Sequence, residues 1–441
     1  MERRSLRILQ RTFTITPLMV LALFFATSVP VSAATKTSVI SRIWTEPASG
    51  YNFILTAIDN AKRSIDLSMY ELSDQSIEQA LITKARSGVD VRVILNSDYE
   101  GVSENSAAMS TLKAGSVHVV WAPSDQIFHA KYLVIDDDVA YIGTGNFVPS
   151  DYSSTRDFWV TDVDSSDVSA VTATFNADFN GGGVDSFQSG GLVWSPGSTE
   201  ALVNLIASAH RSLLVENEEM DSSPVENALI SASRRGVDVE VVMTEDSEWN
   251  DALDRLASSG VHVRVLSASQ VYIHAKVLCV DCSRDAGTVF IGSENFSSSS
   301  LVYNRELGII SSTLAAVRAV RSAVERDYGN GVSVVTPPGT TATSAPSAGS
   351  GVTITSVLAS VAPGDYESLT AHTSVAGQSC SLSVVLPSGY VSESSGLGRA
   401  TSSSAGNVRW SWRIGTSTDP GTATANVTCG ANTSSTRFAI S

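Results

Sequence analysis

The sequence has little cysteine and a shortage of basic residues. Four cysteines in 441 residues exclude a small domain held together mainly by disulfide bonds. Lysine and arginine number 29 against 45 aspartate and glutamate residues, which gives a net charge of −16. Such a surface opposes non-specific binding to nucleic-acid backbones, which relies on cationic side chains. A small cationic pocket within an acidic surface is still compatible with this balance.

Long apolar segments are missing after Ala34, so the later sequence offers no membrane-spanning helix. Hydrophobic residues make up 43% and charged residues 17% of the chain. These values are typical of a folded globular protein and exclude general disorder. A chain of 441 residues exceeds the usual size of one hydrophobic core, so we expect two or three domains.

The first 33 residues have the pattern of a secretory signal peptide. Four arginines open the chain: Arg3, Arg4, Arg7 and Arg11. An apolar run, Leu18–Ala26, and the small residues around Ala33 follow. This run is too short to span a bilayer and ends in a cleavage-type sequence. We therefore expect residues 1–33 to be removed and the protein to be secreted.

One unit occurs twice in the chain. Residues 57–98 match residues 205–246 at a constant offset of 148, without gaps. Arg63 and Ser64 fall on Arg211 and Ser212 in this alignment. We place the first copy at residues 40–185 and the second at residues 190–330.

Each copy alternates between strand and helix patterns. In the first copy we expect three strands and three helices. The strands are Ser64–Met69, Asp90–Leu95 and Val117–Trp121, and the helices are Ile77–Ser87, Asn105–Ala114 and Ser166–Asn180. Ser312–Tyr328 is the closing helix of the second copy. Interleaved strands and helices predict an α/β fold with a mixed or parallel sheet covered on both faces. Two such halves would pair as a pseudo-dimer.

The composition changes after Tyr328. Residues 331–350 are rich in Pro, Gly, Ser, Thr and Ala and are expected to form a linker. In residues 351–441 the helical patterns vanish and short β-prone runs replace them. We expect a small immunoglobulin-like β-sandwich in which Cys380 and Cys429 form a disulfide bond between opposite sheets.

Each copy contains a cluster of polar residues that suits phosphate chemistry. The two clusters are His129, Lys131, Asp136, Gly143, Thr144 and Asn146, and His274, Lys276, Asp281, Gly292, Ser293 and Asn295. Residues two apart in a strand share a face, so each histidine points the same way as its lysine. An imidazole can attack phosphorus while an ammonium group binds the phosphoryl oxygens. We expect the glycine turns to bring the hydroxyl and amide side chains to the same place.

These clusters are H-x-K-x4-D motifs, each followed by G-[ST]-x-N, and the chain resembles the phospholipase D superfamily over about residues 40–330. The resemblance implies phosphodiester exchange without a metal or other cofactor. One histidine would form a phosphohistidine, and the other would act as acid and base. By family analogy we favour His129 as the nucleophile and His274 as the acid/base.

The resemblance also assigns roles to other residues. Phosphate oxygens would be bound by Lys131, Lys276, Asn146, Asn295, Thr144 and Ser293. Asp157 and Glu306 lie where the family places a carboxylate that orients the catalytic imidazole. Asp136 and Asp281 belong to the catalytic motif, but we expect them to stabilise the local fold.

Three features stay open at the level of sequence. Asp281 is followed by ten residues before Gly292, against six in the first copy, which indicates either a longer hairpin turn or a register slip that displaces Asn295. Cys279 and Cys282 form either a local disulfide or two buried thiols. The equivalent residues Glu71 and Glu219 lie either in a solvated loop or at the cleft.

We expect a monomeric phospholipase D that acts on phospholipid at a membrane or micelle surface and releases phosphatidic acid and an alcohol. Export favours hydrolysis over transfer, and acidity disfavours a nucleic-acid groove. The alternatives are a secreted nuclease, a phosphatidyl transferase and an inactive binding protein. The sequence does not decide headgroup preference or the role of the tail.

Overall fold

The structure is a computed structural model of the chain. It describes residues 36–98, 101–124, 126–181, 186–282 and 286–334, and most of residues 351–440. The predicted signal peptide and most of the predicted linker lie outside the described residues. No helix among the described residues is both long and apolar enough to cross a bilayer.

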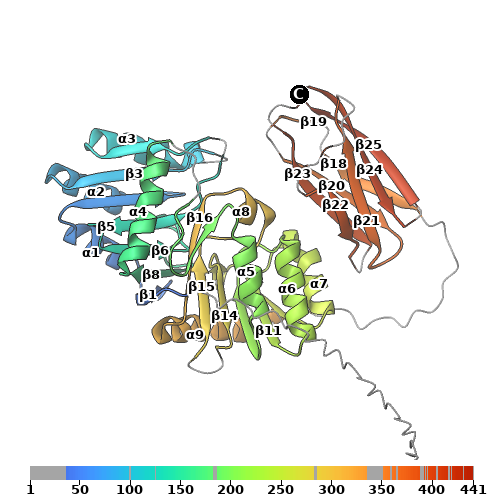
Figure 1. Cartoon of the computed structure of the whole chain (residues 1–441), viewed down its shortest axis with the longest axis horizontal. Coiled ribbons are helices and arrows are strands. Elements are labelled where there is room, and N and C mark those ends of the chain that lie inside the picture. The colour runs from blue at the N-terminus through green and yellow to red at the C-terminus, as the bar shows by residue number, and fades with distance from the viewer. Residues whose placement is uncertain are drawn as a thin grey trace, which may run out of the picture. The chain divides into compact units, whose positions relative to one another are not determined.

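The first copy is a mixed sheet with helices packed against it (Figure 1). Its strands are β1 (Ile40–Thr45), β2 (Ser64–Met69), β3 (Asp90–Leu95), β4 (His118–Trp121), β5 (Lys131–Ile135), β6 (Val139–Gly143) and β8 (Phe158–Asp162). Its helices are α1 (Asn52–Asn60), α2 (Gln75–Arg86), α3 (Gly101–Ala114) and α4 (Ser165–Phe179). The strand order is β1-β8-β6-β5-β2-β3-β4. Strands β2, β3 and β4 are parallel, and the other neighbours are antiparallel.

The second copy repeats this topology. Its strands are β9 (Leu192–Ser195), β10 (Ser212–Glu216), β11 (Asp238–Thr244), β12 (His262–Leu266), β14 (Val277–Val280), β15 (Thr288–Gly292), β16 (Glu306–Ser311) and β17 (Val332–Ser333). Its helical segments are α5 (Thr199–Ala207), α6 (Ser223–Arg234), η1 (Ser247–Trp249), α7 (Asn250–Ser258), α8 (Ser298–Val302) and α9 (Leu314–Asn330). The order β17-β12-β11-β10-β14-β15-β16-β9 matches the first sheet and adds β17 at one edge. The second sheet therefore extends into the stretch predicted as linker.

Local signals explain the helix that follows the second strand of each copy, α2 after β2 and α6 after β10. The Asp74 side chain caps α2 by accepting hydrogen bonds from the next turn. Ile77 and Leu81 face the core. Gly88 and its equivalent Gly236 follow the helices with φ of 93° and 87°, a left-handed conformation that glycine adopts without strain. Both predicted strands of this unit, β2 and β3, have the bounds that the sequence indicated.

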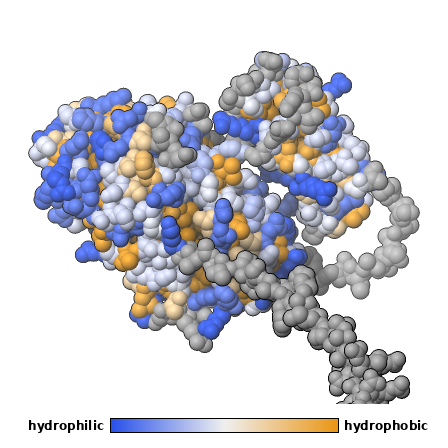
Figure 2. Space-filling view, in the orientation of Figure 1, coloured by the Kyte–Doolittle hydropathy of each residue, from blue (hydrophilic) through white to orange (hydrophobic). Residues whose placement is uncertain are grey.

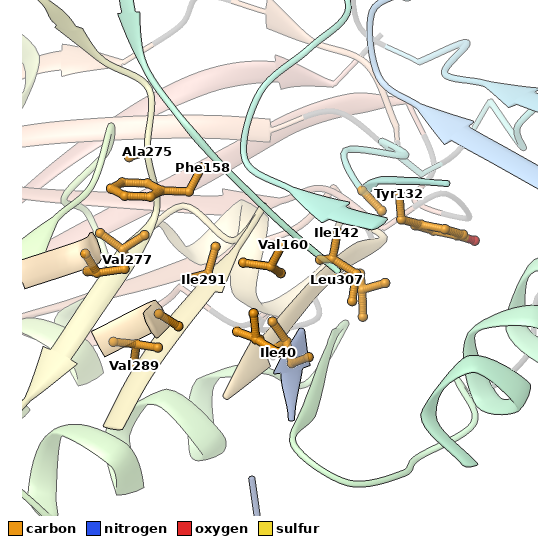
Figure 3. Close-up of a cluster of buried hydrophobic side chains, with 14 of the residues drawn as sticks. Ile40, Tyr132, Ile142, Phe158, Val160, Ala275, Val277, Val289, Ile291 and Leu307 are labelled. Atoms are coloured by element: carbon orange, nitrogen blue, oxygen red, sulfur yellow. The ribbon is translucent and has the colours of Figure 1, made fainter. Parts of the chain in front are cut away.

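Each sheet packs different partners on its two faces. Helices α1, α2 and α3 cover one face of the first sheet, and α5, α6 and α7 cover the corresponding face of the second. A shared core lies on the other faces, together with α4 and α9. It joins Ile142 and Phe158 of the first copy to Ile291 and Leu307 of the second (Figure 3). The predicted duplicated α/β fold is confirmed, and the pseudo-dimer interface has an apolar core.

The tail is a β-sandwich of two sheets. The strands of one are β18 (Val352–Val357), β20 (Tyr366–Thr373) and β23 (Asn407–Arg413). Those of the other are β19 (Ser360–Val361), β21 (Ser379–Val385), β22 (Gly398–Thr401), β24 (Gly421–Cys429) and β25 (Asn432–Ile440). Trp410 and Trp412 lie in the core between them.

The tail disulfide differs from the prediction in its placement. Cys380 and Cys429 are bonded, but they lie opposite each other on β21 and β24, which are neighbouring strands of one sheet. The expectation that this bond joins the two sheets is therefore wrong. The buried tryptophans and the apolar residues of both sheets hold the sandwich together instead.

Candidate active site

Short backbone pairings bring the two copies together at the histidines. Strand β13 (Tyr272–Ile273), just before His274, pairs in parallel with β7 (Thr155–Arg156) of the first copy. At the equivalent place, the backbone N–H of His129 donates to the carbonyl of Arg305 at 2.9 Å. Each histidine-bearing segment is thus aligned by the carboxylate-bearing segment of the other copy.

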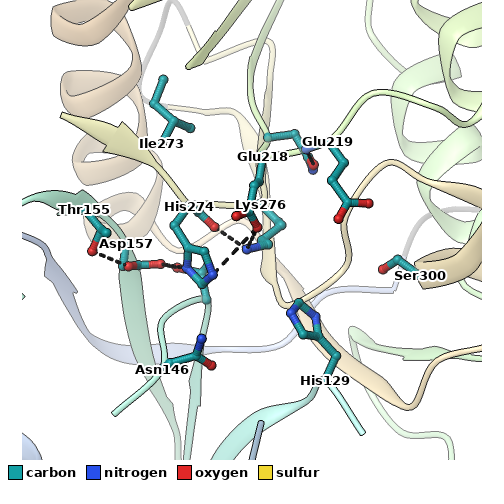
Figure 4. A network of polar contacts seen from close by, with 12 residues as sticks. His129, Asn146, Thr155, Asp157, Glu218, Glu219, Ile273, His274, Lys276 and Ser300 are labelled. Atoms are coloured by element: carbon teal, nitrogen blue, oxygen red, sulfur yellow. Dashed lines mark hydrogen bonds and ion pairs between the residues drawn. The ribbon is translucent and has the colours of Figure 1, made fainter. Parts of the chain in front are cut away.

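The histidines are oriented by carboxylates across the interface. His129 Nδ1 lies 2.8 Å from Glu306 Oε2, and His274 Nδ1 lies 2.9 Å from Asp157 Oδ1. All four side chains are nearly buried. Figure 4 shows the two imidazoles on either side of one space, with Lys276 between them. Since Nδ1 is occupied in both rings, Nε2 is the nitrogen available to a ligand.

Two arginines repeat this crosswise pattern. Arg156 of the first copy pairs with Asp327 on α9 at 2.5 Å, and Arg305 of the second pairs with Asp178 on α4 at 2.7 Å. These side chains are at most 5% exposed. Breaking a buried pair leaves an uncompensated charge. The arginines therefore fix the carboxylates beside them in the sequence.

The electrostatics keep the orienting carboxylates ionised. Burial alone would raise the pKa of both Asp157 and Glu306, but the neighbouring histidines and lysines outweigh it and hold each pKa below its usual value. Burial lowers the pKa of His129 to about 4, although Glu306 opposes this shift. His129 is therefore neutral at pH 7, with its proton on Nδ1 and a lone pair on Nε2.

The two lysines lie beneath the histidines and are fully buried. Lys131 Nζ donates to the carbonyl of His129 at 2.6 Å, and Lys276 Nζ donates to that of His274. Burial and the neighbouring Lys276 lower the pKa of Lys131 to about 7. An ammonium group so poorly hydrated is ready to bind an anion.

The amides and two further carboxylates lie at the same space. Asn146 and Asn295 are buried, and their Oδ1 atoms have no hydrogen-bond partner among the described residues. Asn146 Nδ2 is 3.5 Å from Glu71 Oε2. Glu219, the equivalent of Glu71, borders the hollow that contains His129, and burial raises its pKa to about 7. The alternative left open for Glu71 and Glu219 is thus decided in favour of the cleft.

The hydroxyls have a different role from the predicted one. Thr144 Oγ1 donates to Asp157 Oδ1 at 2.5 Å and accepts from the backbone N–H of Phe158. Ser293 Oγ accepts from the backbone N–H of Leu307, and its hydrogen bond to Glu306 helps to lower the pKa of that carboxyl. Both side chains are fully buried. Thr144 and Ser293 therefore support the carboxylates rather than bind phosphate.

The motif aspartates stabilise the fold outside the cleft. Asp136 accepts from the backbone N–H groups of residues 62–64, and Asp281 accepts from those of residues 210–212. Both have positive φ, at 57° and 53°, and so end β5 and β14 in sharp turns. Their inclusion among the catalytic residues is corrected, because they contact backbone far along the sheet from the imidazoles.

Replacing Asp136 by alanine is expected to lower the free energy of unfolding by about 3 kcal/mol, because three partly buried backbone N–H donors lose a charged acceptor. Chemical denaturation monitored by circular dichroism measures this change. Asp138→Ala is the matched control, since Asp138 is 66% exposed and its one ion pair among the described residues is with exposed Arg63. This variant should change stability by less than about 1 kcal/mol. Equal effects of the two variants would contradict this role.

The additional residues of the second motif form a longer hairpin. Val277 pairs with Ile291 as Tyr132 pairs with Ile142, so the register is kept and Asn295 remains in place. Residues 283–285 lie outside the described residues. At the base of this hairpin Cys279 and Cys282 form a disulfide bond, which decides the alternative that the sequence left open.

Sequence reasoning missed Glu218 and Tyr70. Glu218 Oε2 is 2.8 Å from Lys276 Nζ and 3.7 Å from His274 Nε2. Its equivalent, Tyr70, instead places its ring 4.7 Å from that of His129 and 4.8 Å from Lys131 Nζ. The internal alignment would have revealed this difference between otherwise matching positions.

No group of three or more His, Cys, Asp and Glu side chains suited to a metal ion occurs in the described part of the chain. The residues present instead combine two imidazoles, two ammonium groups and two amides around one space. This set suits the binding of a phosphoryl group and a transfer of that group to nitrogen.

The duplicated body matches the family model described as the PLD-like domain of cardiolipin synthase twice, over residues 54–179 and 202–328. The chain belongs to this phospholipase D-like family. A cardiolipin synthase 1 from Bacillus anthracis is 34% identical over 100 residues, which cover 22% of this chain and 19% of the relative. A phospholipase D from Rickettsia conorii is 32% identical over 110 residues, which cover 25% of this chain and 54% of the relative.

The matches span only part of these relatives, about a fifth of the synthase and about half of the phospholipase D. Among solved structures, a phosphatidylserine synthase from Haemophilus influenzae aligns with a TM-score of 0.53 and 12% identity, over 68% of this chain and 89% of the other. That likeness supports the duplicated fold alone.

Proposed function

We propose that this chain is a secreted phospholipase D-type phosphodiesterase that hydrolyses phospholipids to phosphatidic acid and an alcohol. The observation that carries the proposal is the pair of imidazoles facing one space, each held by a carboxylate of the other copy (Figure 4). A phosphodiester placed there would meet a nucleophile on one side and a proton donor on the other.

In the proposed reaction His129 Nε2 attacks phosphorus and forms a P–N bond. The P–O bond to the headgroup breaks as His274 donates its Nε2 proton to the departing oxygen. Water then attacks phosphorus and gives a proton to His274, and the P–N bond breaks with its electron pair returning to His129. Neutral His129 suits the first step. The Glu218 carboxylate near His274 Nε2 is compatible with a proton on that nitrogen.

The remaining residues stabilise charge. Lys131 and Lys276 would bind the non-bridging oxygens, and Asn146 and Asn295 would donate hydrogen bonds to them. Lys131 begins β5 and Lys276 directly precedes β14, while Asn146 and Asn295 follow the ends of β6 and β15. Donors placed in this way by the sheets would need little reorganisation during the reaction. Because each copy contributes one histidine and one lysine, neither copy would be active alone.

Lipid is favoured over nucleic acid by charge. The chain carries −16, and acidic residues such as Glu219 and Asp221 border the hollow beside His129. These acidic residues would repel the many phosphate charges of a nucleic-acid backbone. A lipid phosphodiester brings only one negative charge into the site, so the repulsion would be much smaller. The relatives' names, phospholipase D and cardiolipin synthase, support the same substrate class. On the face shown in Figure 2, apolar residues are scattered among polar ones, in keeping with peripheral and reversible contact with a membrane.

The test is headgroup release from phospholipid vesicles, measured beside cleavage of single- and double-stranded DNA. We expect lipid turnover that persists in EDTA and no cleavage of DNA. Cleavage of DNA without lipid turnover would favour the nuclease, and product formed only with added alcohol would favour the transferase. Export is tested separately by sequencing the amino terminus of protein recovered from the culture medium, where a start near Ala34 is expected.

The pH profile of kcat/KM should be bell-shaped, with its maximum at about pH 5–6. His129 must be unprotonated to attack, so activity rises as the pH passes its pKa of about 4. Lys131 must be charged to bind phosphate, so activity falls as the pH passes its pKa of about 7. Hydrolysis of a soluble chromogenic diester measures this profile without interference from vesicles. Activity that keeps rising to pH 9 would contradict the assignment of Lys131.

A further inference from the structure

The two half-sites differ at one position. Tyr70 and Glu218 occupy equivalent places after β2 and β10. The tyrosine ring lies against His129 and Lys131 without adding a formal charge. The glutamate instead brings a carboxylate to His274 and Lys276. Among the described residues, only the second half-site therefore has a carboxylate in ion-pair contact with its lysine.

The contacts of Glu218 are those that a phosphoryl oxygen would make. Its Oε2 atom lies 2.8 Å from Lys276 Nζ and 3.7 Å from His274 Nε2. Lys276 is fully buried, so this carboxylate is its neutralising partner in the free protein. Burial would raise the pKa of Glu218, but Lys276 and His274 outweigh it and hold that pKa far below its usual value. Glu218 is thus an anion at any working pH.

A tether holds the carboxylate in this place. The Tyr272 hydroxyl donates to Glu218 Oε1 at 2.8 Å. Tyr272 is 36% exposed, and its equivalent in the first copy, by the alignment of His129 with His274, is Ile127. Glu218 itself is 19% exposed, so it has an open side toward which it can move. The tyrosine and the glutamate occur together in the second copy only.

We propose that Glu218 is an internal competitor for phosphate. It occupies Lys276 and His274 in the free site, a substrate phosphoryl group displaces it, and its return helps to expel the anionic product. The inference rests on the proposed function for its role in turnover, but the competition itself is a property of binding. Glu218 is therefore a specificity-determining residue that disfavours phosphate dianions more than diester monoanions.

The experiment measures the Kd of inorganic phosphate by isothermal titration calorimetry at constant pH and ionic strength. Glu218→Gln is expected to lower the Kd about tenfold, which corresponds to about 1.4 kcal/mol. Tyr272→Phe should lower it about threefold, because it loosens the tether without removing the charge. Glu200→Gln is the matched control and should change the Kd less than twofold, since Glu200 is exposed on α5, which covers the face of the second sheet opposite the shared core.

If Glu218 had only a structural role, replacing it would weaken phosphate binding. Tighter phosphate binding by Glu218→Gln would therefore indicate competition rather than a damaged site. The proposal would be overturned if Glu218→Gln melts at the same temperature as the wild type and its Kd for phosphate is unchanged or raised. If that variant does not fold, Tyr272→Phe decides in the same way. Turnover of a chromogenic diester is measured in parallel. Absence of turnover in every variant, with the expected series of Kd values, would reject the proposed function and leave the competition intact.

Discussion

His129→Ala should abolish hydrolysis of every phosphodiester, with a loss of about 10⁴-fold or more in kcat, because it removes the proposed nucleophile. His274→Ala should be equally inactive on a lipid whose alcohol needs a proton to depart. With a p-nitrophenyl diester the departing group needs no proton, so His274→Ala should still release one equivalent of p-nitrophenol in a burst. The phosphorylated enzyme should then accumulate and be visible by mass spectrometry.

The controls for this pair are the exposed histidines His118 and His262, which begin the equivalent strands β4 and β12. Alanine at either position should leave kcat within about twofold, since surface substitutions away from a site have little effect. A burst from His129→Ala and none from His274→Ala would reverse the assignment of the nucleophile. Full activity of both variants would reject histidine catalysis altogether.

Glu306→Gln is expected to lower kcat roughly 10²- to 10⁴-fold, although Glu306 belongs to the other copy and does not touch the substrate. Its carboxylate accepts from His129 Nδ1 at 2.8 Å and from Ser300 Oγ at 2.7 Å. A glutamine amide can donate to Nδ1 instead, which moves the imidazole proton to Nε2 and removes the attacking lone pair. Glu306→Asp should retain more activity than Glu306→Gln, because it keeps the charge and the first copy uses Asp157 in the same role.

The measurement is single-turnover release of p-nitrophenol, which reports formation of the P–N bond. Glu306→Gln should slow this phase, whereas Asp157→Asn should slow it little, since that variant impairs the protonation step. Asp238→Asn is the matched control, because Asp238 also faces a histidine but at an exposed site. Equal slowing of the burst by Glu306→Gln and Asp157→Asn would contradict the division of roles.

Much of the fold followed from local pattern. The repeat at residues 57–98 and 205–246 predicted two equivalent sheets, and strands β2 and β3 have the expected bounds. Helix α3 begins at Gly101 rather than Asn105, because its first turn carries no buried apolar face that a periodicity could reveal. These features depend on residues close together in the chain, where side-chain pattern and backbone preference act directly.

The site could be predicted as a set of residues but not as an arrangement. His129 and Glu306 are 177 residues apart, and His274 and Asp157 are 117 apart. Their crosswise pairing depends on how the two sheets dock, which no single motif encodes. The same reason explains why Thr144 and Ser293 were wrongly predicted to bind phosphate. Their hydroxyls contact the orienting carboxylates, and only the docked structure shows those contacts.

By itself the sequence determined that the chain holds one unit twice, that each unit carries a histidine and a lysine on one face of a strand, and that a β-rich tail follows. Only the tertiary structure decided which carboxylate orients which imidazole. It also showed that Cys380 and Cys429 lie within one sheet and that Glu218 forms an ion pair with Lys276. The physical reason is that hydrophobic periodicity specifies local backbone, whereas contacts between distant residues arise from the packing of an apolar interface that forms between the copies.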